Sequence, residues 1–342
     1  MCSKAMRNEN KMNILYQSDD RYAWITGVSL TSLLENNKNA DEIHIYVMDD
    51  HISPENREKL LSLAQRYGRS LEFLEMDDVS ELLSALGAPK WSGSYAAYGR
   101  LFAMGMIREK LDRLLYLDSD TIVTKDLSEL YHSALGENVC AMVQDTAPYF
   151  VYKHIGHSRK DTYFNTGVIL FDVEKWKRLD CESSVTPCIH ALRKTLCYPD
   201  QDVLNRFLKN RIKKLSPKYN FFVFFLAEDL DELFSTQSID KVLNYYSKSE
   251  IRQAGESAAI YHYLAYDKPW LEGNRCPLAD LWEYYLERSP WKGTKKTEQK
   301  RGRLSIYVQR LVNKYPLPGT KKAIHKLYQI STLPALRWIT RI

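Results

Sequence analysis

The sequence lacks an apolar run long enough to cross a membrane. Its longest uninterrupted apolar stretch, Phe221 to Ala227, is far shorter than the ~18 to 20 residues that a transmembrane helix requires. The first ten residues also lack the apolar segment of a secretory signal. These two absences predict a cytoplasmic protein.

Cysteine and glycine motifs are equally sparse. The six cysteines of this 342-residue chain form no Cys-x-x-Cys pair, which predicts free thiols in a reducing compartment. Neither a Walker-type phosphate loop nor a Gly-x-Gly-x-x-Gly motif occurs. The sequence therefore counts against ordinary P-loop NTPases and against dinucleotide oxidoreductases.

Charge is distributed unevenly along the chain. Residues 291–342 hold thirteen Lys and Arg against one acidic residue, Glu298, so this tail carries +12 and the rest of the chain −7 within a net charge of +5. The asymmetry predicts two units, a body over residues 12–290 and a basic tail over residues 291–342.

The tail has the pattern of amphipathic helices. Apolar residues recur at helical spacing at Leu304, Tyr307, Val308, Leu311, Val312 and Tyr315, and again at Ile324, Leu327 and Tyr328. Basic amphipathic helices with aromatic residues suit an anionic membrane surface, which predicts peripheral attachment to the inner face of the cell membrane. The alternative is that these helices pack on the body. Nucleic acid is disfavoured as a partner because the body is acidic and carries no nucleic-acid motif.

Short apolar runs alternate with helix-like segments along the body. Strand patterns occur at residues 13–17, 43–47, 71–74, 114–117, 139–143 and 166–171. Helix patterns occur at residues 22–35 and 95–107, and Ser53 followed by Pro54 predicts the start of another helix. This alternation predicts an α/β fold, in which ligands bind at the carboxyl ends of the strands.

Asp-x-Asp occurs three times, at 118/120, 200/202 and 229/231, whereas about one occurrence is expected by chance from twenty-two aspartates. Only Asp118 and Asp120 directly follow an apolar strand-like run. Two carboxylates that leave a sheet edge in this way can share one divalent ion. In the absence of a Gly-rich loop, the pair predicts a metal held jointly by protein and substrate phosphates.

Six motifs follow one another between residues 13 and 272. They are Ser18-Asp19-Asp20-Arg21-Tyr22, Tyr98-Gly99-Arg100-Leu101, Leu115-Tyr-Leu-Asp-Ser-Asp120, Phe164-Asn-Thr-Gly-Val168, Asp200-Gln-Asp-Val-Leu204, and His262 with Lys268-Pro269-Trp270. Together they resemble family 8 glycosyltransferases, which include bacterial lipopolysaccharide galactosyl- and glucosyltransferases and glycogenin. The resemblance implies a GT-A fold, a single Rossmann-like nucleotide-binding domain with a mixed sheet over residues 12–290, before the helical tail. It also implies transfer of glucose or galactose from a UDP-sugar to a hydroxyl of a cell-envelope saccharide or glycolipid, with retention.

The resemblance also implies a role for each matching residue. Asp118, Asp120 and His262 would hold Mn²⁺, with Mg²⁺ as the alternative, against the diphosphate, and hard carboxylates with one imidazole favour Mn²⁺. Asp19 would accept the uracil N–H and Tyr22 would stack on the base. Lys268 and Ala265 would lie at the phosphates and Ser119 beside the donor. Arg100, Asn165, Asp200 and Gln201 would surround the donor sugar. Among all these residues, the resemblance implies that Gln201, Asp200 and Lys268 are catalytic.

Two features concern the chemistry itself. Gln201 matches the position beneath the anomeric carbon, and an amide is a poor nucleophile, so a same-face route in which the departing phosphate takes the acceptor's proton is favoured. Ala265 stands where the family has Gly in its His-x-x-Gly-x-x-Lys-Pro-Trp block. A methyl group there would loosen the diphosphate contact or shift the loop.

Two other functions are compatible with the same residues. One is a catalytically silent module that binds a sugar nucleotide or a surface, and intact Asp118, Asp120 and His262 count against it. The other is a nucleotidyltransferase, which the lack of a triphosphate loop disfavours.

Overall fold

The structure is a computed structural model that describes residues 11–298 except 92, 228, 238, 240, 241, 265 and 266. The amphipathic helices expected over residues 304–328 and the departure at Ala265 lie outside the described residues. Among the described residues, none of the helices has the length and apolarity that would be needed to span a bilayer.

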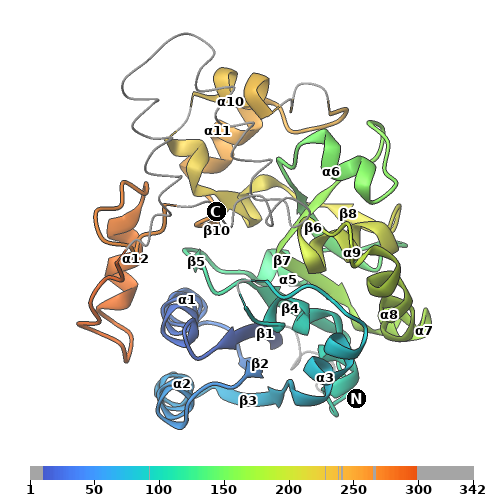
Figure 1. The fold of residues 1–342 in the computed structure, drawn as a ribbon. Coiled ribbons are helices and arrows are strands. Elements are labelled where there is room, and N and C mark those ends of the chain that lie inside the picture. Colours follow the sequence, from blue (N-terminus) through green and yellow to red (C-terminus); the bar gives the residue numbers. More distant parts are fainter. Residues whose placement is uncertain are drawn as a thin grey trace, which may run out of the picture.

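In the part of the chain that the structure describes, ten strands form two sheets. Their bounds are β1 Lys11–Asp19, β2 Glu42–Asp50, β3 Ser70–Glu75, β4 Arg113–Leu117, β5 Thr121–Val123, β6 Cys140–Gln144, β7 Phe164–Asp172, β8 Ile212–Lys214, β9 Phe221–Phe222 and β10 Ile260–His262. A seven-stranded sheet has the order β3-β2-β1-β4-β7-β6-β8, and a three-stranded sheet has the order β5-β10-β9. In Figure 1, β5 and β10 of the small sheet lie between α1 and α11.

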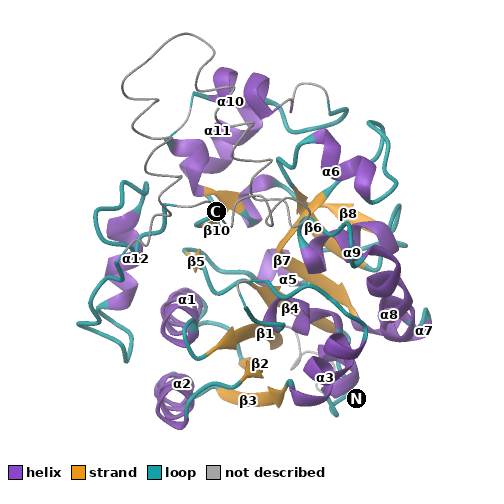
Figure 2. Cartoon of the chain, viewed as in Figure 1, coloured by secondary structure: helices purple, strands orange, loops and turns teal. Residues whose placement is uncertain are grey.

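Helices cover both faces of the large sheet (Figure 2). The α-helices are α1 Ala23–Asn36, α2 Pro54–Arg66, α3 Asp77–Ala85, α4 Ala103–Met106, α5 Ser128–Tyr131, α6 Tyr149–His154, α7 Val173–Arg178, α8 Cys181–Leu192, α9 Pro199–Phe207, α10 Leu230–Gln237, α11 Lys248–Glu256 and α12 Ala279–Leu286. Three 3₁₀ helices are described, η1 Ala96–Leu101, η2 Pro217–Tyr219 and η3 Val223–Leu226.

The strand directions bring distant residues to one edge of the large sheet. β1, β2, β3 and β4 run parallel to one another, whereas β7 runs antiparallel to both β4 and β6. Leu117 at the end of β4 is therefore paired with Val168 in the middle of β7, and the first residues of β7 extend past the end of β4. The carboxyl ends of β1, β2 and β4 and the beginning of β7 share this edge, and the α/β class predicted from the sequence is confirmed.

The core lies on the two faces of the large sheet. Ile14 and Tyr16 of β1 face the cluster that contains α1 and α2, while Leu15 between them belongs to the cluster on the opposite face with η1, α3 and α8. All three side chains are fully buried. Strands covered on both faces need such continuous apolar runs, which explains why β1 has no polar alternation.

Two predicted helices show where local rules hold and where they do not. Ser53 caps α2 by accepting a hydrogen bond from the Asn56 backbone N–H, with Pro54 at the first position, as predicted. The single helix expected over residues 95–107 is instead η1 followed by the four-residue α4. Gly99 lies within η1 and Gly105 within α4, and glycine is a poor helix former.

The chain beyond Pro290 begins on the surface of the body. Trp291 is 5% exposed, lies directly on Gly27 of α1, and donates from Nε1 to the Asn56 side chain over 2.9 Å. The Thr297 N–H donates to the carbonyl of Trp270 over 2.9 Å. The first residues of the predicted tail therefore pack on the body, and the division of the chain after Pro290 stays a prediction.

Candidate active site

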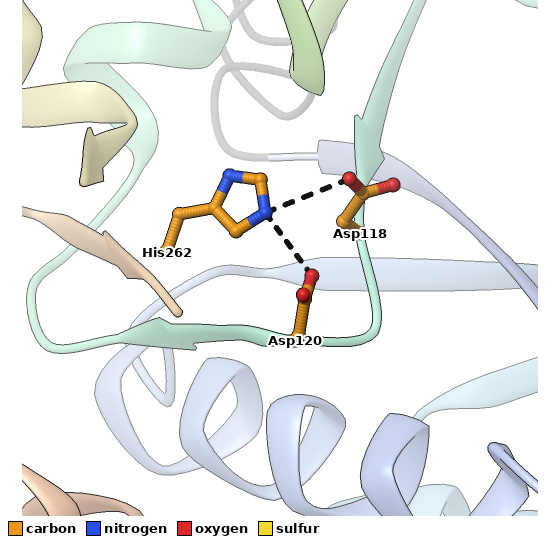
Figure 3. Close-up of side chains that lie close together, drawn as sticks. All are labelled: Asp118, Asp120 and His262. Atoms are coloured by element: carbon orange, nitrogen blue, oxygen red, sulfur yellow. Dashed lines mark ion pairs between the residues drawn. The ribbon is translucent and has the colours of Figure 1, made fainter. Parts of the chain in front are cut away.

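Two aspartates and a histidine converge at the end of β4. Asp118 and Asp120 flank the turn from β4 to β5, and β10 pairs antiparallel with β5 so that His262 lies opposite Thr121. His262 Nε2 lies 3.1 Å from Asp120 Oδ1 and 3.7 Å from Asp118 Oδ2 (Figure 3). One ligand atom from each of the three residues falls within 4.8 Å of the others. The geometry therefore fits a shared metal ion with carboxylate and imidazole donors.

Asp120 contacts both Lys268 and His262. Its Oδ2 accepts a hydrogen bond from Lys268 Nζ over 2.6 Å, while its Oδ1 faces His262. Burial by itself would raise the pKa of Asp120, but Lys268 and His262 hold that pKa far below its usual value. The carboxylate therefore stays ionised at any physiological pH, as a metal ligand must.

Arg100 lies between Asp118 and a further carboxylate, Asp200. Its side chain is 5% exposed, donates to Asp118 Oδ1 over 3.0 Å, and lies 3.3 Å from Asp200 Oδ2. It also donates to the Thr166 carbonyl over 2.5 Å and stacks over the Tyr116 ring at 4.0 Å. Burial raises the pKa of Asp200 although Arg100 opposes the shift. Arg100 is therefore a buried counter-ion that fixes both carboxylates.

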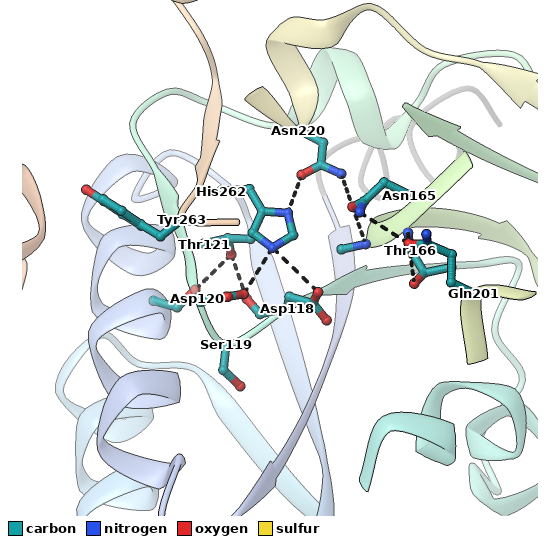
Figure 4. A network of polar contacts seen from close by, with 12 residues as sticks. Asp118, Ser119, Asp120, Thr121, Asn165, Thr166, Gln201, Asn220, His262 and Tyr263 are labelled. Atoms are coloured by element: carbon teal, nitrogen blue, oxygen red, sulfur yellow. Dashed lines mark hydrogen bonds and ion pairs between the residues drawn. The ribbon is translucent and has the colours of Figure 1, made fainter. Parts of the chain in front are cut away.

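A group of amides lies beside the cluster. Asn165 Nδ2 donates to Gln201 Oε1 over 3.2 Å (Figure 4). Asp145 Oδ2 accepts from Asn165 Nδ2 over 2.8 Å and from Gln201 Nε2 over 3.2 Å. The Thr166 backbone N–H donates to Gln201 Oε1 over 3.1 Å. Gln201 is thus fixed by two donors and one carboxylate, and burial raises the pKa of Asp145.

The residues expected at the base lie at the carboxyl end of β1. Asp19 Oδ1 accepts the Tyr22 backbone N–H over 3.0 Å, and its Oδ2 is paired with Arg21. Tyr22 is 40% exposed and lies edge-on to Trp270, with ring centroids 6.5 Å apart. An exposed ring at the mouth of the site is available for stacking, whereas the Asp19 carboxylate is already engaged with its own turn.

Ser119 ties the Asp118–Asp120 turn to the first strand and helix. Its hydroxyl lies 2.8 Å from Thr26 Oγ1 and donates to the Gln17 carbonyl over 3.0 Å. These two hydrogen bonds hold the Asp118–Asp120 turn against β1 and α1. Ala265 lies outside the described residues.

Two site residues were not found from the sequence. Asp145 follows the strand predicted at residues 139–143, and this position at a strand's carboxyl end was a usable indication. Asn220 Oδ1 lies 2.9 Å from His262 Nδ1. Asn220 belongs to no recognisable motif and only precedes the apolar run that begins at Phe221, so nothing in the sequence indicated this contact. Asp202, by contrast, receives the Cys197 and Tyr198 N–H groups and serves the local structure.

Gly167 leaves the space that the His262 ring occupies. An added Cβ would overlap His262 Cε1 and Nδ1. We expect Gly167→Ala to lower the affinity for Mn²⁺ about 10- to 100-fold by displacing the ring, as measured by titration of free Mn²⁺. Gly255→Ala is the matched control, because its Cβ would meet the Phe221 ring at 2.8 Å instead. Equal Mn²⁺ affinities of the two variants would contradict this role of Gly167.

Comparisons with known proteins identify the family and agree with the fold. The sequence profile described as Glycosyl transferase family 8 matches residues 13–273. A lipopolysaccharide 1,2-glucosyltransferase of Escherichia coli (strain K12) is 30% identical over 285 residues, covering 82% of this chain and 79% of that protein. A lipopolysaccharide 1,3-galactosyltransferase of Salmonella typhimurium (strain LT2) is 26% identical over 294 residues, covering 82% and 80%. The crystal structure of galactosyltransferase LgtC with donor and acceptor sugar analogs superposes with a TM-score of 0.68 at 24% identity, covering 82% of this chain and 96% of that one.

The fold is that of the GT-A class of glycosyltransferases. The chain belongs to glycosyl transferase family 8, as the motifs in its sequence predicted.

Proposed function

We propose that this protein is a retaining hexosyltransferase that moves glucose or galactose from a UDP-sugar to a hydroxyl of a cell-envelope saccharide or glycolipid. The observation that carries the proposal is the cluster of Asp118, Asp120 and His262 with Lys268 beside it, in a family 8 glycosyltransferase. Two relatives are named as a glucosyl- and a galactosyltransferase of lipopolysaccharide, which supports a hexose donor and a saccharide acceptor.

The three clustered residues would hold a divalent cation, Mn²⁺ or Mg²⁺. When bound, such an ion supplies Lewis-acid neutralisation of the charge that develops on the departing diphosphate. Lys268 lies 2.6 Å from Asp120 and places a second positive charge at the same point. Leaving-group departure would thus need no general acid.

The sugar would lie over the amide group of Gln201 and Asn165. Gln201 Oε1 already accepts the Thr166 N–H and its Nε2 donates to Asp145, so this amide is suited to positioning and not to attack. In the proposed step the bond from the anomeric carbon to the diphosphate oxygen breaks, and a bond to the acceptor oxygen forms on the same face. The acceptor's proton passes to the departing phosphate oxygen.

Thermal melting with nucleotides tests the donor and the metal together. A ligand at 100 times its Kd adds about 2.7 kcal/mol to the free energy of unfolding, which is readily seen as a rise in Tm. We expect such a rise with UDP plus Mn²⁺, and a much smaller one with UDP in EDTA or with ADP or GDP plus Mn²⁺. Equal shifts with and without the metal would contradict the metal-bridged diphosphate.

Association of the basic tail with an anionic membrane surface belongs to the same proposal. It rests on the charge of residues 291–342 and on their helical pattern in the sequence. A glycolipid acceptor at the inner face of the membrane would then lie close to the active site.

A further inference from the structure

We propose that Asn220 is a positioning residue that fixes the tautomer and the orientation of His262, so that the imidazole presents the lone pair of Nε2 to a divalent cation. The inference rests on the metal site of the proposed function and adds a residue to it. Asn220 is 1% exposed and lies between His262 and Asn165 (Figure 4).

One member of this hydrogen-bond network, a backbone N–H, has a fixed role. The backbone N–H of Gly167 can only donate, and it lies 2.9 Å from the Asn165 side-chain oxygen. That atom is therefore the acceptor end of the amide, and Nδ2 must face the other way. It does, because its partners are the Asp145 carboxylate and Gln201 Oε1, which itself accepts the Thr166 backbone N–H.

The orientation of the Asn165 amide fixes that of Asn220, which in turn fixes the histidine. The Asn165 oxygen is also 2.8 Å from one end of the Asn220 amide, which must consequently be the donor Nδ2. The Asn220 oxygen then faces His262 Nδ1 over 2.9 Å. Because an amide oxygen only accepts, Nδ1 carries the hydrogen, and in the neutral ring Nε2 carries none.

The consequence appears on the other side of the ring. Nε2 faces Asp120 Oδ1 at 3.1 Å and Asp118 Oδ2 at 3.7 Å. A bare nitrogen lone pair that points at two carboxylates is repelled by them, whereas a divalent cation between the three atoms makes the arrangement favourable. Metal-binding histidines are commonly oriented by such a partner on the second ring nitrogen.

The hydrogen-bond chain also links the metal site to the proposed sugar site. Asn165 contacts Asn220 on one side and Gln201 and Asp145 on the other. The residue that fixes His262 is therefore held by the same amide group that would position the donor sugar.

The first test needs no variant. In metal-free protein at a pH where the ring is neutral, ¹⁵N-histidine labelling with long-range ¹H–¹⁵N correlation reports the tautomer, and the His262 signal is assigned by its loss in His262→Gln. We expect the Nδ1–H tautomer. The Nε2–H tautomer would overturn the inference whatever the protein's activity.

The second test measures the affinity for Mn²⁺ in the presence of UDP by EPR of the free ion. Asn220→Leu and Asn220→Ala should weaken Mn²⁺ binding 10- to 100-fold. Asn37→Ala is the matched control, because Asn37 is also fully buried and lies away from the cluster. Its side-chain oxygen accepts a hydrogen bond of 2.8 Å from the Leu127 N–H. It should lower Tm to a similar extent but leave Mn²⁺ affinity unchanged.

The outcomes separate this inference from the proposed function. If wild-type protein binds Mn²⁺ and folded Asn220→Leu binds it equally well, the positioning role fails while the metal site stands. If wild-type protein does not bind Mn²⁺ with UDP, the metal site fails and the inference falls with it.

Discussion

Replacing Asp120 by Asn should lower the rate of sugar transfer at least about 100-fold, which corresponds to about 2.7 kcal/mol of transition-state stabilisation. The substitution removes one ligand charge from the cluster and leaves Lys268 without the carboxylate to which it donates over 2.6 Å. The measurement is the release of UDP from UDP-glucose or UDP-galactose with Mn²⁺, with and without a saccharide acceptor.

Asp231→Asn is the matched control for this experiment. Asp231 belongs to another Asp-x-Asp pair of the chain, but it is exposed and pairs with Lys248 away from the cluster. It should leave turnover unchanged. If wild-type protein binds UDP with Mn²⁺ but shows no turnover with any UDP-hexose, the silent binding module becomes the better description. Undiminished turnover by Asp120→Asn would reject the metal-dependent mechanism.

Replacing Arg100 by Met should lower the free energy of unfolding by about 3 to 5 kcal/mol, the usual effect of removing one partner from a buried ion pair. Arg100 lies between Asp118 and Asp200, and both carboxylates would be left without their cation. This is a large share of the ~5 to 15 kcal/mol that stabilises a typical protein. Urea unfolding followed by circular dichroism measures the change.

The pH dependence of this effect has a definite sign. Burial already raises the pKa of Asp200, and loss of Arg100 would raise it further. A carboxyl whose folded pKa exceeds its unfolded pKa destabilises the fold when it is ionised, so the loss should be largest at neutral pH and partly relieved as pH falls.

Lys11→Met is the control for Arg100→Met. It removes a cation from an exposed pair with Glu42, 3.1 Å apart, and should cost no more than about 1 kcal/mol. A similar small cost for Arg100→Met would show that Arg100 is not the buried counter-ion described above.

Local sequence rules were sufficient for six of the seven strands of the large sheet. The apolar runs predicted as strands became β1, β2, β3, β4, β6 and β7, because continuous apolar runs between turn residues are what a sheet covered on both faces requires. Ser53 and Pro54 marked the start of α2, since a cap depends only on neighbouring residues. The segment over residues 95–107 departed from its prediction because two glycines weaken its helix.

Some residues of the candidate site could also be found from the sequence, whereas their contacts depend on the fold. Position after an apolar strand was enough to single out Asp118 and Asp120, and the resemblance to family 8 supplied His262, for which no local pattern exists. The cluster itself depends on the pairing of β10 with β5, which joins segments more than a hundred residues apart. The burial of Arg100 between Asp118 and Asp200 depends on the packing of η1 against the sheet edge.

By itself, the sequence determined the α/β class, the carboxylates at the end of β4 and the family, because these follow from short-range periodicity and from ordered motifs. Only the tertiary structure decided which atoms of His262 and Asn220 meet, and that Asp145 contacts Gln201. The physical reason is that hydrogen-bond partners between distant segments are selected by the packing of the whole domain, and no single segment encodes them.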